Sequence, residues 1–395
     1  MPRKVPFSHR SSWSSQPNEL TTLVASQKAT GAVPVDMTLS NPTRAGLPYP
    51  PGLLSSLASP ASLSYEPEPL GLLSSREYLA SWYRARGQHR SAERTVLTAS
   101  SSESYSHLFH LLADPGDEVL IPAPSYPLLS FLADLAGVRL RAYPLHYAGA
   151  WFIDLEMLRE MVNERTRAIL VVSPNNPTGS YVKESEAAAL QELAQEQGLA
   201  LISDEVFAEY PLQGPPRGRS LAEYDGCLTF ALGGLSKLVG LPQLKLGWIF
   251  VSGPDIQVTE ALSRLEIIAD TYLSVSTPVQ QALPSLLEAA EEVGDAIRER
   301  THRNLTTLRR ALEGTTATVL DTEGGWYTVL HLPSTLTEME WTLALLRNGV
   351  HVHPGHFFDF PREPFVVLSL LPEPKDFDEG LRRILQTLEE KISIF

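Results

Sequence analysis

The sequence lacks a second cysteine, an excess of positive charge and any long apolar run. Its 395 residues contain one cysteine, Cys227, which cannot form a disulfide within the chain. Lysine and arginine number 32 against 46 aspartate and glutamate residues, so the formal net charge is −14. This charge argues against a nucleic-acid or anionic-membrane partner. No window approaches the roughly 20 apolar residues of a membrane span, and the basic N-terminus lacks the apolar core of a secretory signal. We therefore expect a soluble, cytoplasmic protein.

Composition and length are those of a globular chain with more than one domain. Hydrophobic residues make up 43% and charged residues 20% of the sequence, and the length suggests two domains with sizeable cores. Apolar strands, such as those expected at 166–172 and 199–204, alternate with helices such as the one between them. Such alternation is typical of α/β proteins with a largely parallel sheet that is buried on both faces.

The pattern changes after about residue 277. A long helical stretch to about residue 312 is followed by short strands near 316–320, 326–331 and 365–371, which is typical of a smaller α+β domain. We expect an N-terminal arm that contributes to the small domain (1–40), a large domain (41–276) and a small C-terminal domain (277–395).

Three short motifs each follow a predicted strand of the large domain. They are "VVSPNNPTGS" (171–180), "LISDEVFAEY" (201–210) and "LGGLSKL" (232–238), of which the last belongs to a stretch that reads as strand, tight turn and strand. Taken singly, the first motif fits a plain turn, the second a helix N-cap, and the third a partly solvated lysine in a turn. Because parallel strands end at one edge of a sheet, the asparagines of the first motif, Asp204 and Lys237 should converge on one crevice. An amine that can form a Schiff base, with a carboxylate that can hold a pyridinium nitrogen protonated, is what pyridoxal phosphate requires.

In order and spacing, these motifs and others resemble the class I/II aminotransferases of fold type I, which use pyridoxal phosphate. The resemblance covers nearly the whole chain and includes "YEPEPLG" at 65, "PSYP" at 124, "SKLVGLPQLKLGW" at 236, "GGWYTVLHLP" at 324 and "VHVHPGHFF" at 350. It implies an aspartate-aminotransferase-like fold: a mostly parallel, seven-stranded-type sheet flanked by helices, plus a smaller α+β domain. It also implies a homodimer with shared active sites.

The resemblance assigns roles around the cofactor ring. Lys237 would hold the cofactor as a Schiff base and move the proton at the substrate carbon, for which its free amine must be neutral. Asp204 would pair with the pyridinium nitrogen, Asn176 would donate to the 3′ oxygen, and Tyr126 would stack on the ring face.

The resemblance also assigns residues to the cofactor phosphate. Ser100, Ser101 and Ser102 lie at the expected start of a helix, where backbone N–H groups favour an anion. Lys245 falls where the family usually has an arginine, so the charge is kept but the bidentate fork is lost. Tyr65 resembles the tyrosine that reaches the phosphate of the neighbouring subunit.

The sequence departs from the family at several positions. Phe207 occupies the position of a tyrosine that hydrogen-bonds the 3′ oxygen, and Gly234 that of a serine that contacts the phosphate. Val367 occupies the position of the arginine that binds the substrate carboxylate. Arg44 is our preferred replacement for that arginine, and His356 is the second choice.

We therefore expect a transaminase that moves an amino group from an amino acid or related amine to a 2-oxo acid through a Lys237 Schiff base. Another reaction on the same cofactor (decarboxylase, β/γ-lyase or synthase) and a non-catalytic pyridoxal-binding protein remain alternatives. We expect no bound metal.

Overall fold

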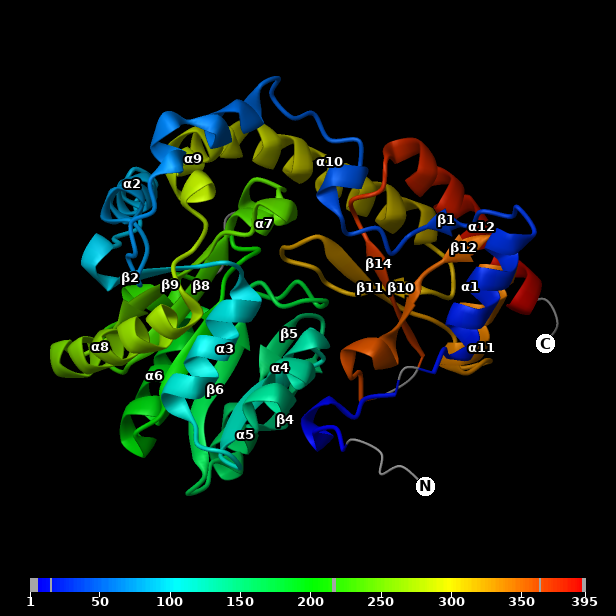
Figure 1. Ribbon diagram of the computed structural model, residues 1–395. Coiled ribbons are helices and arrows are strands. Elements are labelled where there is room, and N and C mark those ends of the chain that lie inside the picture. The colour runs from blue at the N-terminus through cyan, green and yellow to red at the C-terminus, as the bar shows by residue number, and fades with distance from the viewer. Residues whose placement is uncertain (1–5, 15, 215–217, 362–363, 393–395) are drawn as a thin grey trace, which may run out of the picture.

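The computed structural model describes residues 6–14, 16–214, 218–361 and 364–392. A large sheet with flanking helices forms one part of the molecule, and two small sheets with their helices form the other (Figure 1). The helices are α1 (Glu19–Ala29), α2 (Leu73–Arg84), α3 (Ser101–Leu112), α4 (Leu128–Ala136), α5 (Leu155–Met161), α6 (Glu184–Gln197), α7 (Leu235–Leu238), α8 (Asp255–Tyr272), α9 (Thr277–Glu288), α10 (Ala290–Leu312), α11 (Glu338–Arg347) and α12 (Pro374–Ile392).

The large sheet has eight strands in the order β2-β9-β8-β7-β6-β3-β4-β5. They are β2 (Thr95–Thr98), β3 (Glu118–Ala123), β4 (Arg139–Tyr147), β5 (Trp151–Ile153), β6 (Thr166–Val172), β7 (Ala200–Asp204), β8 (Thr229–Gly234) and β9 (Gly247–Ser252). The neighbours from β8 through β4 are parallel, whereas β9 and β5 run antiparallel to theirs. The expected α/β class is confirmed. The sheet has eight strands, where a sheet of the seven-stranded type was expected, and its edge strand β5 is short.

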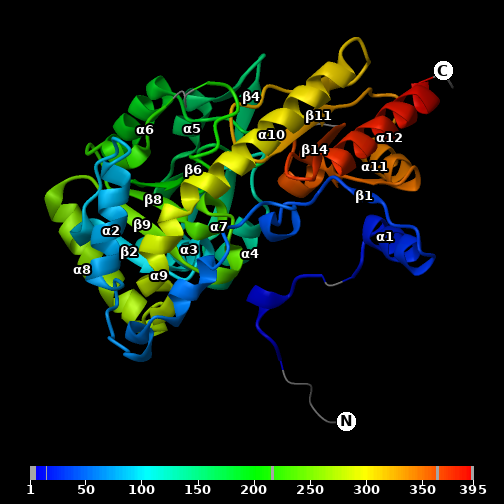
Figure 2. The same ribbon diagram turned by 90° about the horizontal axis from the view of Figure 1, so that it is seen from above.

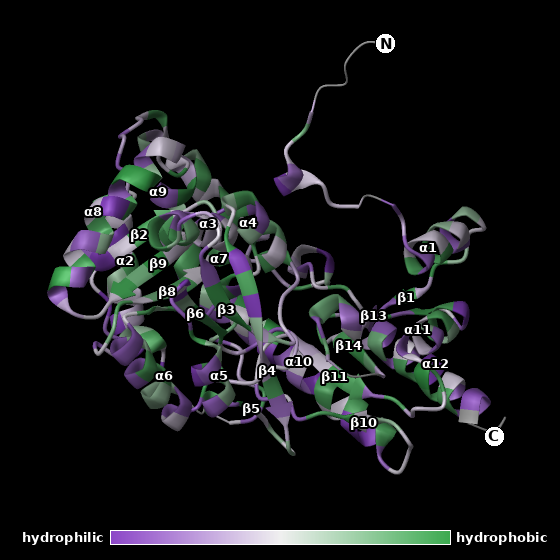
Figure 3. Cartoon of the chain, turned by 90° about the horizontal axis from the view of Figure 1, so that it is seen from below, coloured by the Kyte–Doolittle hydropathy of each residue, from purple (hydrophilic) through white to green (hydrophobic). Residues whose placement is uncertain are grey.

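Helices cover both faces of this sheet, as the continuous apolar strands require. Leu170 and Ile202 pack with residues of α3, α4 and α8 on one face, while Val171 and Leu201 pack with α5 and α6 on the other. Figure 3 shows β8 and β9 in hydrophobic green. Because successive side chains of a strand alternate between faces, Asp204 at the end of β7 points to the α3 face and Glu205 to the opposite one.

The small part contains a four-stranded antiparallel sheet in the order β10-β11-β14-β13. Its strands are β10 (Thr318–Val319), β11 (Tyr327–His331), β13 (His353–Pro354) and β14 (Phe365–Ser369), and beside them β1 (Val35–Asp36) pairs in parallel with β12 (Val350–His351). The helical stretch expected up to residue 312 is two helices, α9 and α10. Helix α10 joins the two parts (Figure 2), because Ile297 packs with Phe207 beside the large sheet and Leu308 packs in the core of the small part.

The N-terminal arm contacts both parts. Its helix α1 lies on α11, where Gln27 donates a 2.8 Å hydrogen bond to the carbonyl of Leu346. Earlier in the chain, Trp13 packs edge-on against Phe131 of α4 and donates a 2.8 Å hydrogen bond to Asp134. Within the described ranges, no helix is both long and apolar enough to cross a membrane.

Candidate active site

Lys237 lies in α7, a single helical turn directly after β8. The sequence predicted a tight turn between two strands here. That prediction is wrong at Lys237, which lies in a helical turn. The turn is held by Tyr210, whose hydroxyl donates a 2.6 Å hydrogen bond to the carbonyl of Lys237. This contact joins α7 to the loop after β7, so that the lysine and Asp204 are held on the same edge of the sheet.

The amine of Lys237 lies between two aromatic rings. Its Nζ is 5.1 Å from the ring centre of Phe207 and 4.9 Å from that of Trp326. Burial lowers the pKa of Lys237 from 10.5 to about 8, against an opposing effect of the Asp204 carboxylate. A neutral amine is therefore available near neutral pH, as a nucleophile or a base requires.

Asp204 is buried and holds two hydrogen bonds. The hydroxyl of Tyr105 donates to its Oδ2 at 2.7 Å, and the backbone N–H of Val206 donates to its Oδ1 at 3.1 Å. Burial raises the pKa of Asp204, while Tyr105, Val206 and the charge of Lys237 lower it. These contacts favour a buried carboxylate that can pair with a ring cation.

Asn176 and Tyr126 lie on the loops after β6 and β3. Asn176 is buried, and its Oδ1 has no hydrogen-bond partner among the described residues. Tyr126 is 42% exposed, so its ring is accessible. The Asp204 charge raises the pKa of Tyr126, although less than burial does, so the two side chains are electrostatic neighbours.

The residues expected at the phosphate meet at the end of β2. Ser100 is the N-cap of α3 and accepts a 3.3 Å hydrogen bond from the backbone of Glu103. Thr98 pairs with Gly247 across antiparallel strands, and Ser100 and Lys245 each lie two residues beyond that pair in the sequence. Ser101 and Ser102 form the first turn of α3. A helix N-terminus, three hydroxyls and a lysine fit an anion.

The residues present thus fit pyridoxal phosphate. A buried amine with a lowered pKa, a buried carboxylate, a buried side-chain amide and a serine-rich helix N-terminus are arranged along one sheet edge. When bound, the cofactor supplies an electron sink for negative charge that develops at the substrate carbon.

Phe207 and Tyr65 lie in contrasting environments. Phe207 is 4% exposed and packs edge-on against Trp326, with ring centres 5.2 Å apart. Its position therefore presents a ring, not a hydroxyl, to Lys237. Tyr65, in contrast, is 60% exposed.

The two candidates for carboxylate binding also differ. Arg44 is exposed and ends a short turn (Pro42–Arg44), and its side chain makes no hydrogen bond or ion pair with other described residues. The next residue, Ala45, packs in the same apolar cluster as Phe207 and Trp326. His356 is held by the buried Glu338, whose Oε1 lies 2.7 Å from Nδ1 of the imidazole.

Sequence reasoning assigned no role to Tyr105, Trp326 or Tyr327. Tyr105 lies one turn after Ser101 on the helix that begins at the phosphate residues, and this spacing could have drawn attention to it. Trp326 and Tyr327 belong to the "GGWYTVLHLP" motif. Trp326 lies near the amine of Lys237 and Tyr327 lies near Phe207 because β11 meets the large sheet, which no local pattern reveals.

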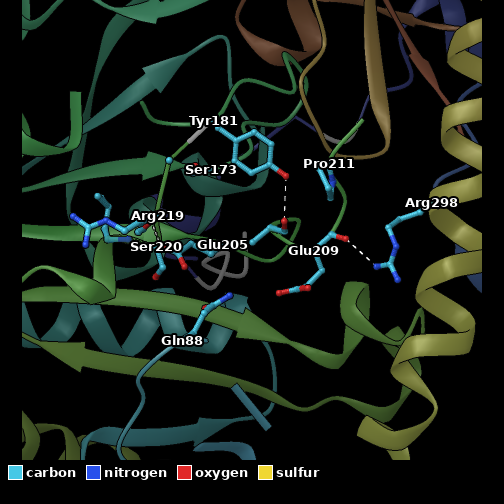
Figure 4. Close-up of a pocket in the computed structure, with 13 residues that line it drawn as sticks. Gln88, Ser173, Tyr181, Glu205, Glu209, Pro211, Arg219, Ser220 and Arg298 are labelled. Carbon is cyan, nitrogen blue, oxygen red and sulfur yellow. Dashed lines mark hydrogen bonds between the residues drawn. The ribbon is translucent and has the colours of Figure 1, made fainter. Parts of the chain in front are cut away.

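A polar cavity lies on the other face of β7 (Figure 4). It has a volume of about 360 Å³ and is lined by Glu205, Glu209 and Arg298, among others, but by neither Lys237 nor Asp204. Arg298 donates a 3.1 Å hydrogen bond to the carbonyl of Glu209 and so ties the loop after β7 to α10. The alternation at the end of β7 separates this cavity from the candidate active site.

The comparisons with known proteins agree with this geometry. Residues 58–384 match the family model "Aminotransferase class I and II". The chain is 29% identical over 229 residues to the glutamate-pyruvate aminotransferase AlaA of Escherichia coli K12, a match that spans 58% of this chain and 56% of that protein. It is 27% identical over 363 residues to human tyrosine aminotransferase, covering 85% of this chain and 77% of the relative.

A solved structure shares the fold. Alanine aminotransferase from Pyrococcus furiosus superposes with a TM-score of 0.88 at 21% identity, covering 98% of this chain and all of that one. Since the family model spans most of the chain and the residues along the sheet edge fit its cofactor, the chain belongs to the aminotransferase class I and II family.

Proposed function

We propose that this protein is a pyridoxal-phosphate-dependent transaminase that moves an amino group from an amino acid or related amine to a 2-oxo acid. The observation that carries the proposal is the amine of Lys237, with a pKa lowered to about 8, on the same sheet edge as the buried carboxylate of Asp204. The aminotransferase names of the relatives support it.

Lys237 is the residue that would transfer the proton of the substrate carbon. Its Nζ, when neutral, would take the proton from the substrate carbon that bears the nitrogen and return it to the carbon on the other side of that nitrogen. The rings of Phe207 and Trp326 flank Nζ and can stabilise the ammonium that forms. The Tyr210 hydrogen bond to the carbonyl of Lys237 orients the turn.

The remaining site residues hold the cofactor. Asp204, whose carboxylate accepts a hydrogen bond from Tyr105, would pair with the ring nitrogen, and Tyr126 would cover the ring. The side-chain N–H of Asn176 would donate a hydrogen bond to the 3′ oxygen. The phosphate residues are Ser100, Ser101, Ser102 and Lys245.

We further propose a cytoplasmic homodimer in which Tyr65 of each chain completes the phosphate site of the other. The 60% exposure of Tyr65 supports a role outside its own chain. We also propose the domain division 1–40, 41–276 and 277–395, with α10 crossing between the two larger units.

Arg44 is our candidate for contact with a substrate carboxylate at the outer rim of the site. Its exposed guanidinium makes no hydrogen bond or ion pair with the described side chains. A guanidinium can donate two parallel hydrogen bonds to one carboxylate, which a lysine cannot do. His356 is the weaker candidate, because its imidazole is already bound to Glu338.

The test combines two measurements on separate samples, which are covalent trapping of the cofactor and a half-reaction with an amine donor. Borohydride reduction of the cofactor-loaded protein, followed by peptide mass spectrometry, should find the pyridoxyl group on Lys237, and Lys245 should be unmodified. In a separate sample that has not been reduced, an amine donor should convert the loaded protein to a form without the original absorbance, and a 2-oxo acid should restore it. An adduct at another residue, or conversion that no 2-oxo acid reverses, would refute the proposal.

A further inference from the structure

Trp326 and Lys237 are positioned by the same residue. The backbone N–H of Gly325 donates a 2.8 Å hydrogen bond to the carbonyl of Tyr210, and the hydroxyl of Tyr210 donates a 2.6 Å hydrogen bond to the carbonyl of Lys237. The carbonyl of Trp326 accepts a 2.7 Å hydrogen bond from the N–H of Leu370. The segment that carries the indole is therefore fastened to the loop that also holds the helical turn of Lys237.

Two glycines let this segment approach the loop so closely. A Cβ atom on Gly324 would lie 2.6 Å from the ring of Tyr181. Gly325 has a φ of 84°, a left-handed conformation that residues with a side chain rarely adopt. A larger residue at either position would displace Trp326 from its place beside Lys237.

The indole of Trp326 turns its face to the amine. Nζ of Lys237 lies over the Trp326 ring, 4.9 Å from its centre, and over the Phe207 ring at 5.1 Å. Phe207 and Tyr210 pack edge-on against the indole, each with ring centres 5.2 Å from it. Trp326 is buried. These contacts therefore hold the plane of the indole and leave its face to the amine.

Few groups stabilise the ammonium form of Lys237. The Asp204 carboxylate raises the pKa of Lys237, against the larger lowering by burial. Burial raises the pKa of Tyr105, Tyr126 and Tyr210, so these phenols are neutral near pH 8. Of the described residues around the amine, this leaves the two ring faces to attract the ammonium as well.

We propose that Trp326 is a positioning residue for proton transfer: its indole face holds the free amine of Lys237 and favours the ammonium form. Indole is the best aromatic partner for a cation, and it lies closer to Nζ than the ring of Phe207 does. An aliphatic side chain here would bury the amine but would not attract its charge. This inference rests on the proposed transaminase function and adds a residue that sets the pH at which Lys237 accepts the proton.

The first experiment measures the pKa of Lys237 in the cofactor-free protein. Carbon NMR of protein labelled at the lysine Cε follows each amine through a pH titration, and the signal absent from Lys237→Met identifies Lys237. Trp326→Leu should lower the pKa of Lys237 by about 0.5 to 1 pH unit, because the cation loses its ring partner. Trp326→Phe keeps a ring and should lower it less. An unchanged or raised pKa in both variants would overturn the inference.

Fluorinated tryptophan separates the charge of the ring face from its packing. Fluorine withdraws electrons from the ring with little change of shape, so mono-, di- and trifluorotryptophan should lower the pKa of Lys237 stepwise. The analogues also enter the other tryptophans, so Trp326→Phe protein grown with the same analogues is the matched control. Its pKa should not respond to fluorination. No trend with Trp326 present, or an equal trend in the control, would overturn the inference.

The cofactor-loaded protein links this pKa to the reaction. Because Lys237 must be neutral to accept the proton, the rise of kcat with pH should move to lower pH with each added fluorine. A pKa that falls while this rise stays in place would overturn the positioning role. A wild-type protein that binds the cofactor without transamination would refute the proposed function and with it this inference, whereas the absence of a fluorine trend overturns the inference alone.

Discussion

The hydroxyl of Tyr105 donates a 2.7 Å hydrogen bond to the carboxylate of Asp204, 99 residues away in the chain. Tyr105 lies on α3, whose N-cap is Ser100 at the phosphate end of the candidate site. One helix therefore contacts both the expected phosphate position and the carboxylate expected at the ring nitrogen. This arrangement couples the two ends of the cofactor site through a rigid element.

Removal of this hydroxyl should weaken cofactor binding. Burial raises the pKa of Asp204 and Tyr105 lowers it, so Tyr105→Phe should raise that pKa further and favour the neutral acid. A hydrogen bond to a charged group contributes about 1.5 to 3 kcal/mol, so the dissociation constant of the cofactor should rise roughly ten- to a hundredfold. Fluorescence titration between pH 6 and 8 measures this, and the loss should be larger at the lower pH. Tyr143→Phe is the matched control, since it removes a buried hydroxyl that bonds the carbonyl of Leu170.

Lys237 should destabilise the cofactor-free protein at neutral pH. Its pKa is about 8 in the folded chain and near 10.5 when unfolded, so between these values the unfolded chain binds more protons. The free energy of unfolding should therefore rise with pH over that window, and below pH 8 the folded protein bears the full cost of the buried ammonium. Lys237→Met should unfold with a free energy roughly 1 to 3 kcal/mol higher at pH 7, and this gain should shrink towards pH 10.5.

Chemical denaturation at pH 7 and pH 10 checks this prediction. Lys245→Met is the control, because Lys245 is exposed and its replacement should change the free energy of unfolding by less than about 0.5 kcal/mol. A Lys237→Met protein that is less stable than wild type at pH 7 would contradict the argument.

Phe207→Tyr should move the absorbance transition of the cofactor-loaded protein to lower pH. A phenol donating to the 3′ oxygen would stabilise the deprotonated form of the bound chromophore, and Phe207 offers only a ring beside Lys237. We expect a shift of about one pH unit, which corresponds to about 1.4 kcal/mol. An absorbance titration measures the midpoint, and Phe131→Tyr on α4 serves as the control. An unchanged or raised midpoint would place the 3′ oxygen away from Phe207.

Arg44→Ala should lower kcat/KM for substrates with a carboxylate by roughly ten- to a hundredfold, the effect of about 1.5 to 3 kcal/mol for a charge-assisted bond. Isopropylamine, which has no carboxylate, should be barely affected. Steady-state kinetics with both donors test this, with Arg139→Ala as an exposed arginine control on β4. Equal losses with both donors, or none with either, would remove Arg44 from the site.

Much of this protein could be predicted from local patterns. The apolar runs of β6 and β7, the Asn18 cap of α1 and the glycine that ends α4 follow from periodicity and capping chemistry. The helical turn at Lys237 and the break between α9 and α10 could not be predicted in this way. The break has no strong local signal, since Pro284 lies inside α9 and Ala289 separates the two helices.

The sequence by itself determined the fold class and the set of residues at the ends of β6, β7 and β8, because hydrophobic period and turn chemistry act over a few neighbouring residues. Only the tertiary structure decided what surrounds Lys237. Phe207 and Trp326 flank its amine, yet Trp326 reaches it from the loop before β11, well separated in the chain. Likewise, Val367 lies on the same face of the small sheet as Tyr327 only through strand register, which is fixed by packing between distant segments and not by local sequence.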